Sequence, residues 1–216
     1  MADINALIIF AKAPVPGEVK TRLQPHLSPE ECASIHASFI KDTIILAKRV
    51  DGAAIFLACH PGVENPFFQK LSEDFDIRLM PQNGDDLGER MSNAIKRGLE
   101  MGYKKVVIIG SDSPDLPPEY IKAGFEMLDS TDMAVGPARD GGYYLIGGRR
   151  ELPVFNGIPW GSNQVFEMTL EKAGKYGITF SVLEEWYDID TWEDLQRFRA
   201  SNINLISPKG YSQEFP

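Results

Sequence analysis

The chain of 216 residues is 43% hydrophobic and 25% charged, which is typical of a globular protein with one domain, or one domain with a lobe. Its net charge of −9 excludes the broad basic surfaces that bind nucleic acids or anionic membranes, although a local basic loop can still hold a small phosphorylated ligand. Cys32 and Cys59 have no metal-binding spacing and predict ordinary thiols of a reducing compartment, so we expect a cytoplasmic protein.

Apolar runs alternate with segments of helical periodicity along the chain. The first run, residues 6–11, lacks the basic flank of a signal peptide and predicts a buried strand. Ser28, Pro29 and Glu31 then form a helix-start signal with a capping box, for a helix that ends near residue 49. The other expected helices lie near residues 67–75, 87–101, 119–128, 162–175 and 192–200, and the other expected strands near residues 53–59, 77–80, 106–109, 132–137, 141–148 and 179–183.

This alternation predicts an α/β protein in which helices cover both faces of a mixed, mainly parallel sheet, a three-layer α/β/α architecture. Between Gly136 and Gly161, turn signals replace helical periodicity, so this segment should add sheet and loops around a pocket. Ser162 is the expected N-cap of the next helix. The polar residues 201–216 are expected to form a loosely held tail, and no apolar run approaches the length of a membrane span.

The loop after the first strand carries three cations, Lys12, Lys20 and Arg22, together with Gly17 and Thr21. Loops beyond strand ends are where α/β proteins bind ligands, and this composition suits an oligophosphate. The loop has neither the Walker A spacing nor the GxGxxG dinucleotide pattern. The alternative is a solvated basic loop.

The apolar run at residues 106–109 ends in the acidic turn GSDSPDLP, residues 110–117. Two carboxylates at a strand end are solvated, paired or bound to a cation, and a hard divalent cation that also holds phosphates would explain the pair. Asp112 lies closer to the strand end and is the better ligand. Asp115 could instead serve the turn or cap the next helix.

The segment YDIDTWEDL, residues 187–195, offers a second metal ligand. Asp188 and Asp190 alternate around Ile189 and therefore point to the same side of an extended segment. The alternative is that Asp190 or Thr191 only caps the last helix.

Two further segments are weaker candidates. NGDDLGERM, residues 83–91, begins a helix whose amides could bind a ribose or a base edge, although a helix cap explains its aspartates equally well. RDGGYY, residues 139–144, predicts a tight turn before a strand, with a role facing an acceptor as the second reading. His26, His36 and His60 have no catalytic or metal spacing and are treated as ordinary.

Five segments occur in a fixed order: PVPGEVKTRL, QNGDDLGERM, GSDSPDLP, DGGYYLIG and DIDTWEDL. Over about residues 7–198 this set resembles the nucleotide-diphospho-sugar transferase superfamily, which has a glycosyltransferase A (Rossmann-like) fold. The nearest branch resembles the small bacterial "transferase 1" group associated with radical-SAM/selenodomain proteins. KTRLQPHLSPEE is also similar to the corresponding stretch of phospholactate guanylyltransferases.

The resemblance implies one domain over residues 1–216, with a nucleotide-binding half (1–115), an acceptor-binding half (116–200) and the tail (201–216). It implies that Asp112 and Asp190 hold Mg²⁺ or Mn²⁺, and that Asp112, Lys20 and Arg22 carry catalysis. The candidate nucleotide-binding residues are Ala11, Lys12, Gly17, Lys20, Thr21, Arg22, Gln82, Asp86, Gly88, Arg90 and Ser111. The candidate acceptor-binding residues are Asp140, Gly141, Gly142, Tyr143 and Trp160.

Two departures from the family pattern affect these assignments. GSDSPD replaces a simple Asp-x-Asp and leaves the role of Asp115 open. KAPVPGEVKTR replaces the glycine-rich GxGTR loop of sugar nucleotidyltransferases, whose amides cradle a triphosphate.

We interpret the chain as a metal-dependent transferase that uses a nucleotide-activated donor and a small-molecule acceptor. The resemblance favours glycosyl transfer from a nucleotide-diphospho-sugar. The basic first loop favours the alternative, nucleotidyl transfer from a nucleoside triphosphate to a phosphorylated small molecule with release of pyrophosphate. A third hypothesis is a catalytically silent nucleotide-binding module, which would not need Asp190. The base, the sugar, the acceptor, the general base and the oligomeric state are not identified by the sequence.

Overall fold

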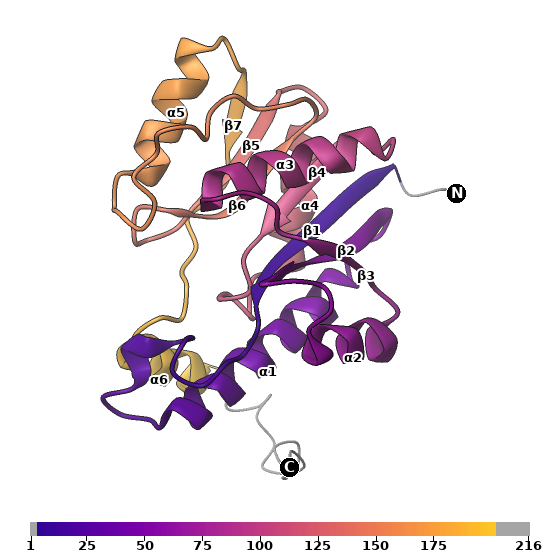
Figure 1. Ribbon diagram of the computed structural model, residues 1–216. Helices are drawn as coiled ribbons and strands as arrows, with labels where there is room; N and C mark the ends of the chain where they lie inside the picture. Colours follow the sequence, from indigo (N-terminus) through magenta and orange to yellow (C-terminus); the bar gives the residue numbers. More distant parts are fainter. Residues whose placement is uncertain (1–3, 202–216) are drawn as a thin grey trace.

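The computed structural model describes residues 4–201, whose strands form one sheet in the order β3-β2-β1-β4-β6-β5-β7 (Figure 1). All neighbouring strands are parallel except β6, which runs antiparallel to both β4 and β5. The predicted mixed, mainly parallel sheet is therefore confirmed. The strands are β1 (Asn5–Lys12), β2 (Ala53–His60), β3 (Arg78–Pro81), β4 (Lys105–Ile109), β5 (Met133–Pro137), β6 (Tyr143–Gly148) and β7 (Phe180–Val182).

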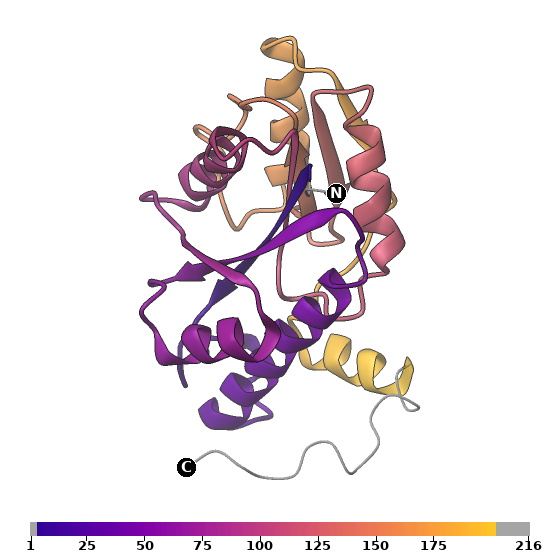
Figure 2. The same ribbon diagram turned by 90° about the vertical axis from the view of Figure 1, so that its right-hand side faces the viewer.

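Helices cover both faces of the sheet, as the sequence predicts (Figure 2). Helices α1 (Pro29–Ala47), α2 (Pro66–Phe75) and α4 (Pro118–Met127) pack on one face, and α3 (Leu87–Glu100) and α5 (Val165–Lys175) pack on the other. A short 3₁₀ helix, η1 (Thr21–Leu23), and the last helix, α6 (Trp192–Ser201), lie outside these layers. Within residues 4–201, no helix combines the length and the apolar character needed to cross a bilayer.

Strand β1 shows why the apolar runs are continuous rather than alternating. Leu7 and Ile9 join the core on the side of α1, whereas Ala6 and Ile8 join the core on the side of α3. Successive side chains of a strand point to opposite faces, so a strand covered on both sides must be apolar at every position. Parallel strands also end at the same edge, which places the loops after β1 and β4 together.

The predicted start of α1 is confirmed, whereas the caps considered for α4 and α5 are not found. The capping box of α1 is present, with reciprocal hydrogen bonds between Ser28 and Glu31. The prediction that Ser162 caps α5 is wrong: the helix begins after Gln164, and the Ser162 hydroxyl accepts from the Gln164 amide within the preceding turn. Asp115 does not cap α4 either, because Pro117 occupies the N-cap position.

A small third core joins the C-terminal segment to the first loop and α1. Leu23 from η1, Phe39 from α1, and Ile189 and Leu195 from the C-terminal segment form this cluster, and all four are buried. Figure 1 shows α6 beside the first loop and the start of α1. Because Ile189 is fully buried here, its neighbours Asp188 and Asp190 are held at the edge of the sheet near the first loop.

Gly147 belongs to β6, the strand between β4 and β5. A Cβ atom at this position would lie 2.8 Å from Val107 Cγ2 and 2.9 Å from the Val106 carbonyl oxygen. We expect Gly147→Ala to lower the free energy of unfolding by about 2 kcal/mol, because a backbone neighbour inside a sheet cannot move away cheaply. Gly174→Ala is the matched control. Its Cβ would meet nothing within 4 Å, so alanine should stabilise α5 by up to about 1 kcal/mol. Urea unfolding of both variants tests the opposite signs, and equal effects would contradict the packing described.

Candidate active site

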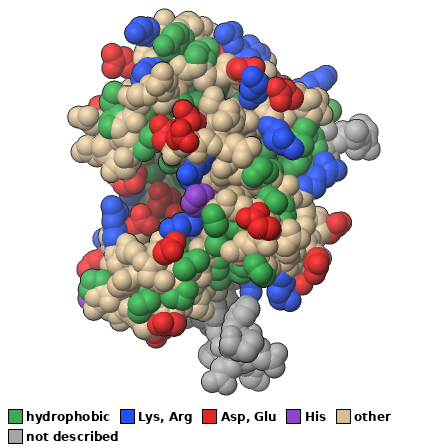
Figure 3. All heavy atoms as spheres, in the orientation of Figure 1, with side chains coloured by type: hydrophobic (Ala, Val, Ile, Leu, Met, Phe, Trp, Pro, Cys, Tyr) green, Lys and Arg blue, Asp and Glu red, His purple; other side chains and the backbone are tan. Residues whose placement is uncertain are grey.

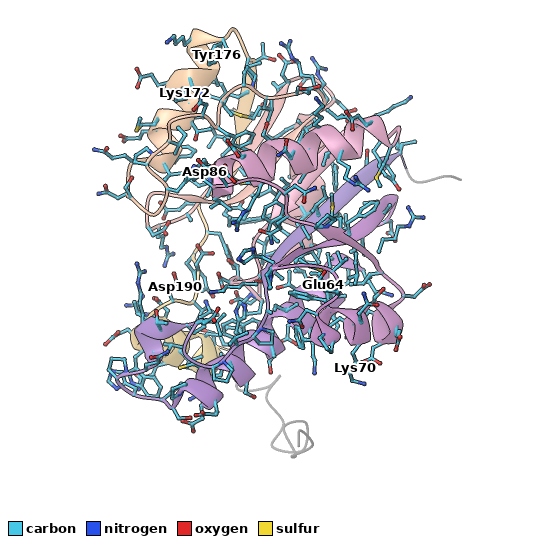
Figure 4. All side chains as sticks on the ribbon, viewed as in Figure 1. Glu64, Lys70, Asp86, Lys172, Tyr176 and Asp190 are labelled. Atoms are coloured by element: carbon cyan, nitrogen blue, oxygen red, sulfur yellow. The ribbon has the colours of Figure 1, made fainter. Side chains whose placement is uncertain are left out.

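Three segments that are distant in the sequence meet at the edge of the sheet where β1 and β4 end. They are the loop after β1, the turn after β4, and the extended segment 187–191 before α6. The Ile189 amide donates to the Asp112 carbonyl oxygen at 2.9 Å, which ties the last segment to the turn. In Figure 4, Asp190 lies between α6 and the end of β1. Lys20, Asp112 and Asp190 are therefore brought together, as the sequence predicts.

Lys20 is the centre of this cluster. Its Nζ donates to the Ile189 carbonyl oxygen at 2.7 Å and to Asp190 Oδ1 at 2.9 Å, and it forms an ion pair with Asp112 Oδ1 at 2.6 Å. The Lys20 side chain is only 3% exposed, and Nζ lies 5.5 Å from the centre of the Phe39 ring. Lys20 also adopts a left-handed backbone (φ 47°), which is uncommon for a non-glycine residue and aims its side chain inward.

The electrostatics of the cluster favour its charged form. Burial by itself would lower the pKa of Lys20, but the charges of Asp112 and Asp190 outweigh it and raise that pKa above its ordinary value. Burial would likewise raise the pKa of Asp112, but the Lys20 ammonium outweighs it and lowers that pKa. At neutral pH we therefore treat the lysine as an ammonium and Asp112 as a carboxylate.

Asp112 and Asp190 offer oxygen donors of the kind that Mg²⁺ and Mn²⁺ prefer. Their side chains are 40% and 38% exposed, whereas Asp112 Oδ1 itself is fully buried, so the exposed part of this carboxylate is Oδ2. Within residues 4–201, no group of three His, Cys, Asp or Glu residues is arranged to hold a metal ion. Two carboxylates fit a cation only if water and phosphate oxygens complete its coordination.

His36 is a neighbour of the cluster that sequence reasoning missed. It comes from α1, and its Nδ1 lies 3.7 Å from Asp112 Oδ1. Nε2 lies 3.1 Å from the Lys12 carbonyl oxygen, so Nε2 carries the proton of the neutral ring. Burial lowers the pKa of His36, which keeps the ring neutral at pH 7. Its spacing in the sequence gives no sign of this contact, because α1 brings it to the site through tertiary packing.

Asp188 and Asp115 have different surroundings from the metal-ligand candidates. The Ser113 hydroxyl lies 2.7 Å from Asp188 Oδ1, and the Tyr187 hydroxyl donates to Asp115 Oδ2. Burial and the charges of Asp112 and Asp190 raise the pKa of Asp188 to about 6, against the opposing hydrogen bond from Ser113. Asp115 thus anchors the segment before α6.

A cavity of about 350 Å³ opens beside the cluster. Figure 3 shows the hollowed face in this region, where acidic and basic side chains lie close together. Three of its lining residues are arginines: Arg22 was predicted as a site residue, Arg139 begins the RDGGYY segment, and Arg197 was not predicted. The Arg22 side chain is 69% exposed and lies 3.6 Å from Asp190 Oδ2. The lining residues are Arg22, Arg139, Asp140, Tyr187, Asp188, Asp190, Thr191, Asp194, Arg197 and Ser201.

The remaining candidates of the first loop lie around the cluster. Lys12 forms an ion pair with Glu18 at 3.2 Å, and Thr21 is exposed at the start of η1. Gly17 has φ 85°, so its position in the turn requires glycine-like backbone freedom. Ala11 and Ser111 are buried, Ala11 in β1 and Ser111 directly after β4.

The candidates from QNGDDLGERM, residues 82–91, make contacts within the protein. The Gln82 amide donates to the carbonyl oxygens of Ala11 and Ala58, at 3.1 and 2.8 Å. Arg90 donates to the Gly84 carbonyl oxygen at 3.1 Å, and Asp86 is the N-cap of α3. Asp86, just before α3, and Asp190, before α6, are both labelled in Figure 4, which shows them on opposite sides of the site.

The predicted acceptor residues fall into two groups. Asp140 lines the cavity, and its Oδ1 accepts from the Gly142 amide in the predicted tight turn. Gly141, with φ 89°, packs against the backbone of Asn163. Tyr143 and Trp160 do not line this cavity. Their rings meet edge to face with centroids 6.4 Å apart, beside the core on the α3 side, where Gly88 also packs against Trp160.

Comparison with known proteins shows the family and the fold of this chain. The model of a family described as "Uncharacterized protein conserved in bacteria (DUF2064)" matches residues 43–162. A crystal structure of a proposed nucleotide-diphospho-sugar transferase from Desulfovibrio desulfuricans G20 is 33% identical in sequence, with a TM-score of 0.86. The alignment covers 98% of this chain and 92% of that protein.

More distant relatives have nucleotidyltransferase names. The 2-phospho-L-lactate guanylyltransferase of Methanobrevibacter smithii is 25% identical over 149 residues, which is 68% of this chain. The match spans 62% of the length of that enzyme. A nucleotidyl transferase from Methanothermobacter shares the fold, with a TM-score of 0.64, 13% identity, and coverage of 94% of this chain and all of that one. The chain thus has the fold that its sequence motifs implied.

Asp188 gives the site a pH dependence whose sign follows from its raised pKa. The folded protein disfavours the ionised form, so stability falls as the pH rises from about 4, where the unfolded chain ionises, through about 6. In the metal-free protein with EDTA, Asp188→Asn should raise the free energy of unfolding by about 2 kcal/mol at pH 8 and have almost no effect near pH 4. Urea titrations at both pH values measure this difference; a gain that is the same at both would contradict it.

Proposed function

We propose that this chain, which belongs to the DUF2064 family, is a nucleotidyltransferase that moves a nucleoside monophosphate from a nucleoside triphosphate to an anionic small molecule. The observation that supports this most directly is the meeting of Lys20, Asp112 and Asp190 at the edge of the sheet beside a cavity with three arginines. Ligands of open α/β sheets bind at this edge. The 25% identity to a guanylyltransferase supports the same chemistry.

The reaction would need little covalent chemistry from the protein. An oxygen of the acceptor phosphate attacks the α-phosphorus, the bond to the bridging oxygen breaks, and pyrophosphate leaves. Asp112 and Asp190 would hold Mg²⁺ or Mn²⁺, which when bound supplies charge stabilisation on the phosphate oxygens. Arg22 is exposed beside Asp190 and is placed to contact the same phosphates. Catalysis would consist mainly of positioning and electrostatics.

The cavity supports an anionic acceptor. Arg22, Arg139 and Arg197 line it, and each has an acidic neighbour within 4 Å, at 3.6 Å from Asp190, 3.5 Å from Glu185 and 3.7 Å from Asp194 respectively. These pairs are exposed and therefore weak, so an incoming phosphate or carboxylate could replace the acidic partner. In this proposal residues 1–115 hold the nucleotide, and residues 116–200 contribute Arg139, Asp140 and Arg197 to the acceptor.

Glycosyl transfer, the reaction favoured in the sequence analysis, remains the second candidate. The 33% identity to a proposed nucleotide-diphospho-sugar transferase favours it. Asp140 and Asp194 also line the cavity and could accept hydrogen bonds from sugar hydroxyls. The third hypothesis, a silent nucleotide-binding module, does not require a carboxylate at position 190.

We also propose a cytoplasmic location, because Cys32 and Cys59 are both buried free thiols.

A screen of nucleoside triphosphates and sugar nucleotides with Mg²⁺ or Mn²⁺ separates these reactions. We expect pyrophosphate release that depends on a nucleoside triphosphate and on a phosphorylated or carboxylated acceptor. Release of a nucleoside diphosphate from a sugar nucleotide would instead support glycosyl transfer. Nucleotide binding without either product would support the silent module.

Asp112→Asn and Asp190→Asn should each lower kcat by about 100-fold or more, because each removes a negative charge that would hold the divalent cation on the phosphates. Asp129→Asn is the matched control. Asp129 pairs with Lys105 at 2.6 Å on another part of the surface, and its loss should leave turnover unchanged. Circular dichroism checks that all three variants fold. Full activity in Asp112→Asn would exclude this residue from the reaction.

A further inference from the structure

We propose that Lys20 is an internal counter-ion that keeps divalent cations off Asp112 and Asp190 until nucleotide phosphates arrive, so that the cation enters together with the nucleotide. This inference rests on the proposed metal and nucleotide site. The inference concerns the order in which the cation and the nucleotide bind. The proposed nucleotidyl transfer is compatible with either order.

The Lys20 ammonium occupies the place between the two carboxylates that a cation would take. Three oxygen atoms surround it at 2.6 to 2.9 Å, from Asp112, Asp190 and the Ile189 carbonyl. Two of its three N–H groups donate to Asp190 and to the Ile189 carbonyl, and Asp112 Oδ1 forms an ion pair with it. The side chain is only 3% exposed, so Nζ lies beneath the carboxylates and not in the open cavity.

A divalent cation on the same carboxylates would lie close to this ammonium. Mg²⁺ bonds carboxylate oxygens at about 2.0–2.1 Å, so on the exposed Oδ2 of Asp112, whose Oδ1 lies 2.6 Å from Nζ, it would sit within roughly 7 Å of Nζ. Repulsion between like charges at that range is strong where the surroundings are partly buried. With Lys20 in place the two carboxylates offer a net charge of −1, and a bare divalent cation would bring the group to +1. The ammonium must leave, or the cation binds weakly.

Nucleotide phosphates remove this obstacle in two ways. Their negative charges offset the excess positive charge, and their oxygens can accept hydrogen bonds from Lys20 in place of the aspartates. The cation and the nucleotide then raise each other's affinity, and this coupling is reciprocal.

The opposite role for Lys20 would be to position the carboxylates for the metal. The structure argues against this, because Asp112 and Asp190 have other supports. The Ile189 amide bonds the Asp112 carbonyl oxygen at 2.9 Å, and Ile189 is fully buried in the third core. The two roles predict opposite signs when the lysine charge is removed: counter-ion removal tightens metal binding, and loss of a positioning contact weakens it.

The test is the binding of Mn²⁺ alone, without nucleotide, followed by the electron paramagnetic resonance signal of free Mn²⁺. We expect Lys20→Met to lower the Kd for Mn²⁺ at least 10-fold relative to the wild type. Lys20→Arg keeps the charge and should bind as weakly as the wild type. Lys12→Met removes a nearby lysine charge that pairs with Glu18 and does not contact the aspartates, so it should change the Kd by less than about 2-fold.

Asp190→Asn added to Lys20→Met must abolish the gain, which excludes Mn²⁺ bound elsewhere on this acidic protein. An unchanged or higher Kd in Lys20→Met overturns the proposal, as does a gain that survives Asp190→Asn. If Lys20→Met does not fold, Lys20→Gln removes the charge and keeps two N–H groups, and the rise in Tm on adding Mn²⁺ should be larger in it than in the wild type. Pyrophosphate release by the wild type is measured separately. The Mn²⁺ titrations test the role of Lys20, and pyrophosphate release tests the proposed nucleotidyl transfer, so the failure of one can be told from the failure of the other.

Discussion

The contact between one buried ammonium and two aspartates holds the candidate site together. Lys20 comes from the loop after the first strand, Asp112 from the turn after β4, and Asp190 from the segment before the last helix. No two of these segments are close in the sequence, and two of the three belong to the edge that parallel strands create. The third is brought to that edge by the small core around Ile189 and Leu195. The fold thus uses electrostatic and apolar contacts together to close the site.

Much of the fold could be predicted because its signals are local. Continuous apolar runs gave the buried strands, and Ser28 with Glu31 gave the start of α1. Parallel topology then explained why the first loop and the acidic turn meet. Ser162 misled because serine favours turns as well as helix caps, and in this chain it serves the turn.

The rest of the site depends on tertiary packing that no local pattern encodes. His36 reaches Asp112 because α1 packs across the end of the first loop, and its spacing from other residues is uninformative. Arg139 and Arg197 line the cavity from two separate segments, and an exposed arginine has no sequence signature. Trp160 and Tyr143, predicted to contact the acceptor, do not line the cavity; their rings pack edge to face on the α3 side of the sheet, where Trp160 also contacts Gly88.

The position of Asp190 late in the chain has a consequence for biosynthesis. A ribosome makes the first loop, every strand of the sheet and all five packing helices before it adds this aspartate and α6. During that interval Lys20 and Asp112 can pair, but the third core cannot close, since Ile189 and Leu195 do not yet exist. A polypeptide that ends before residue 188 therefore contains every strand of the sheet but lacks Asp190 and the apolar residues that close the third core, so it cannot assemble the site.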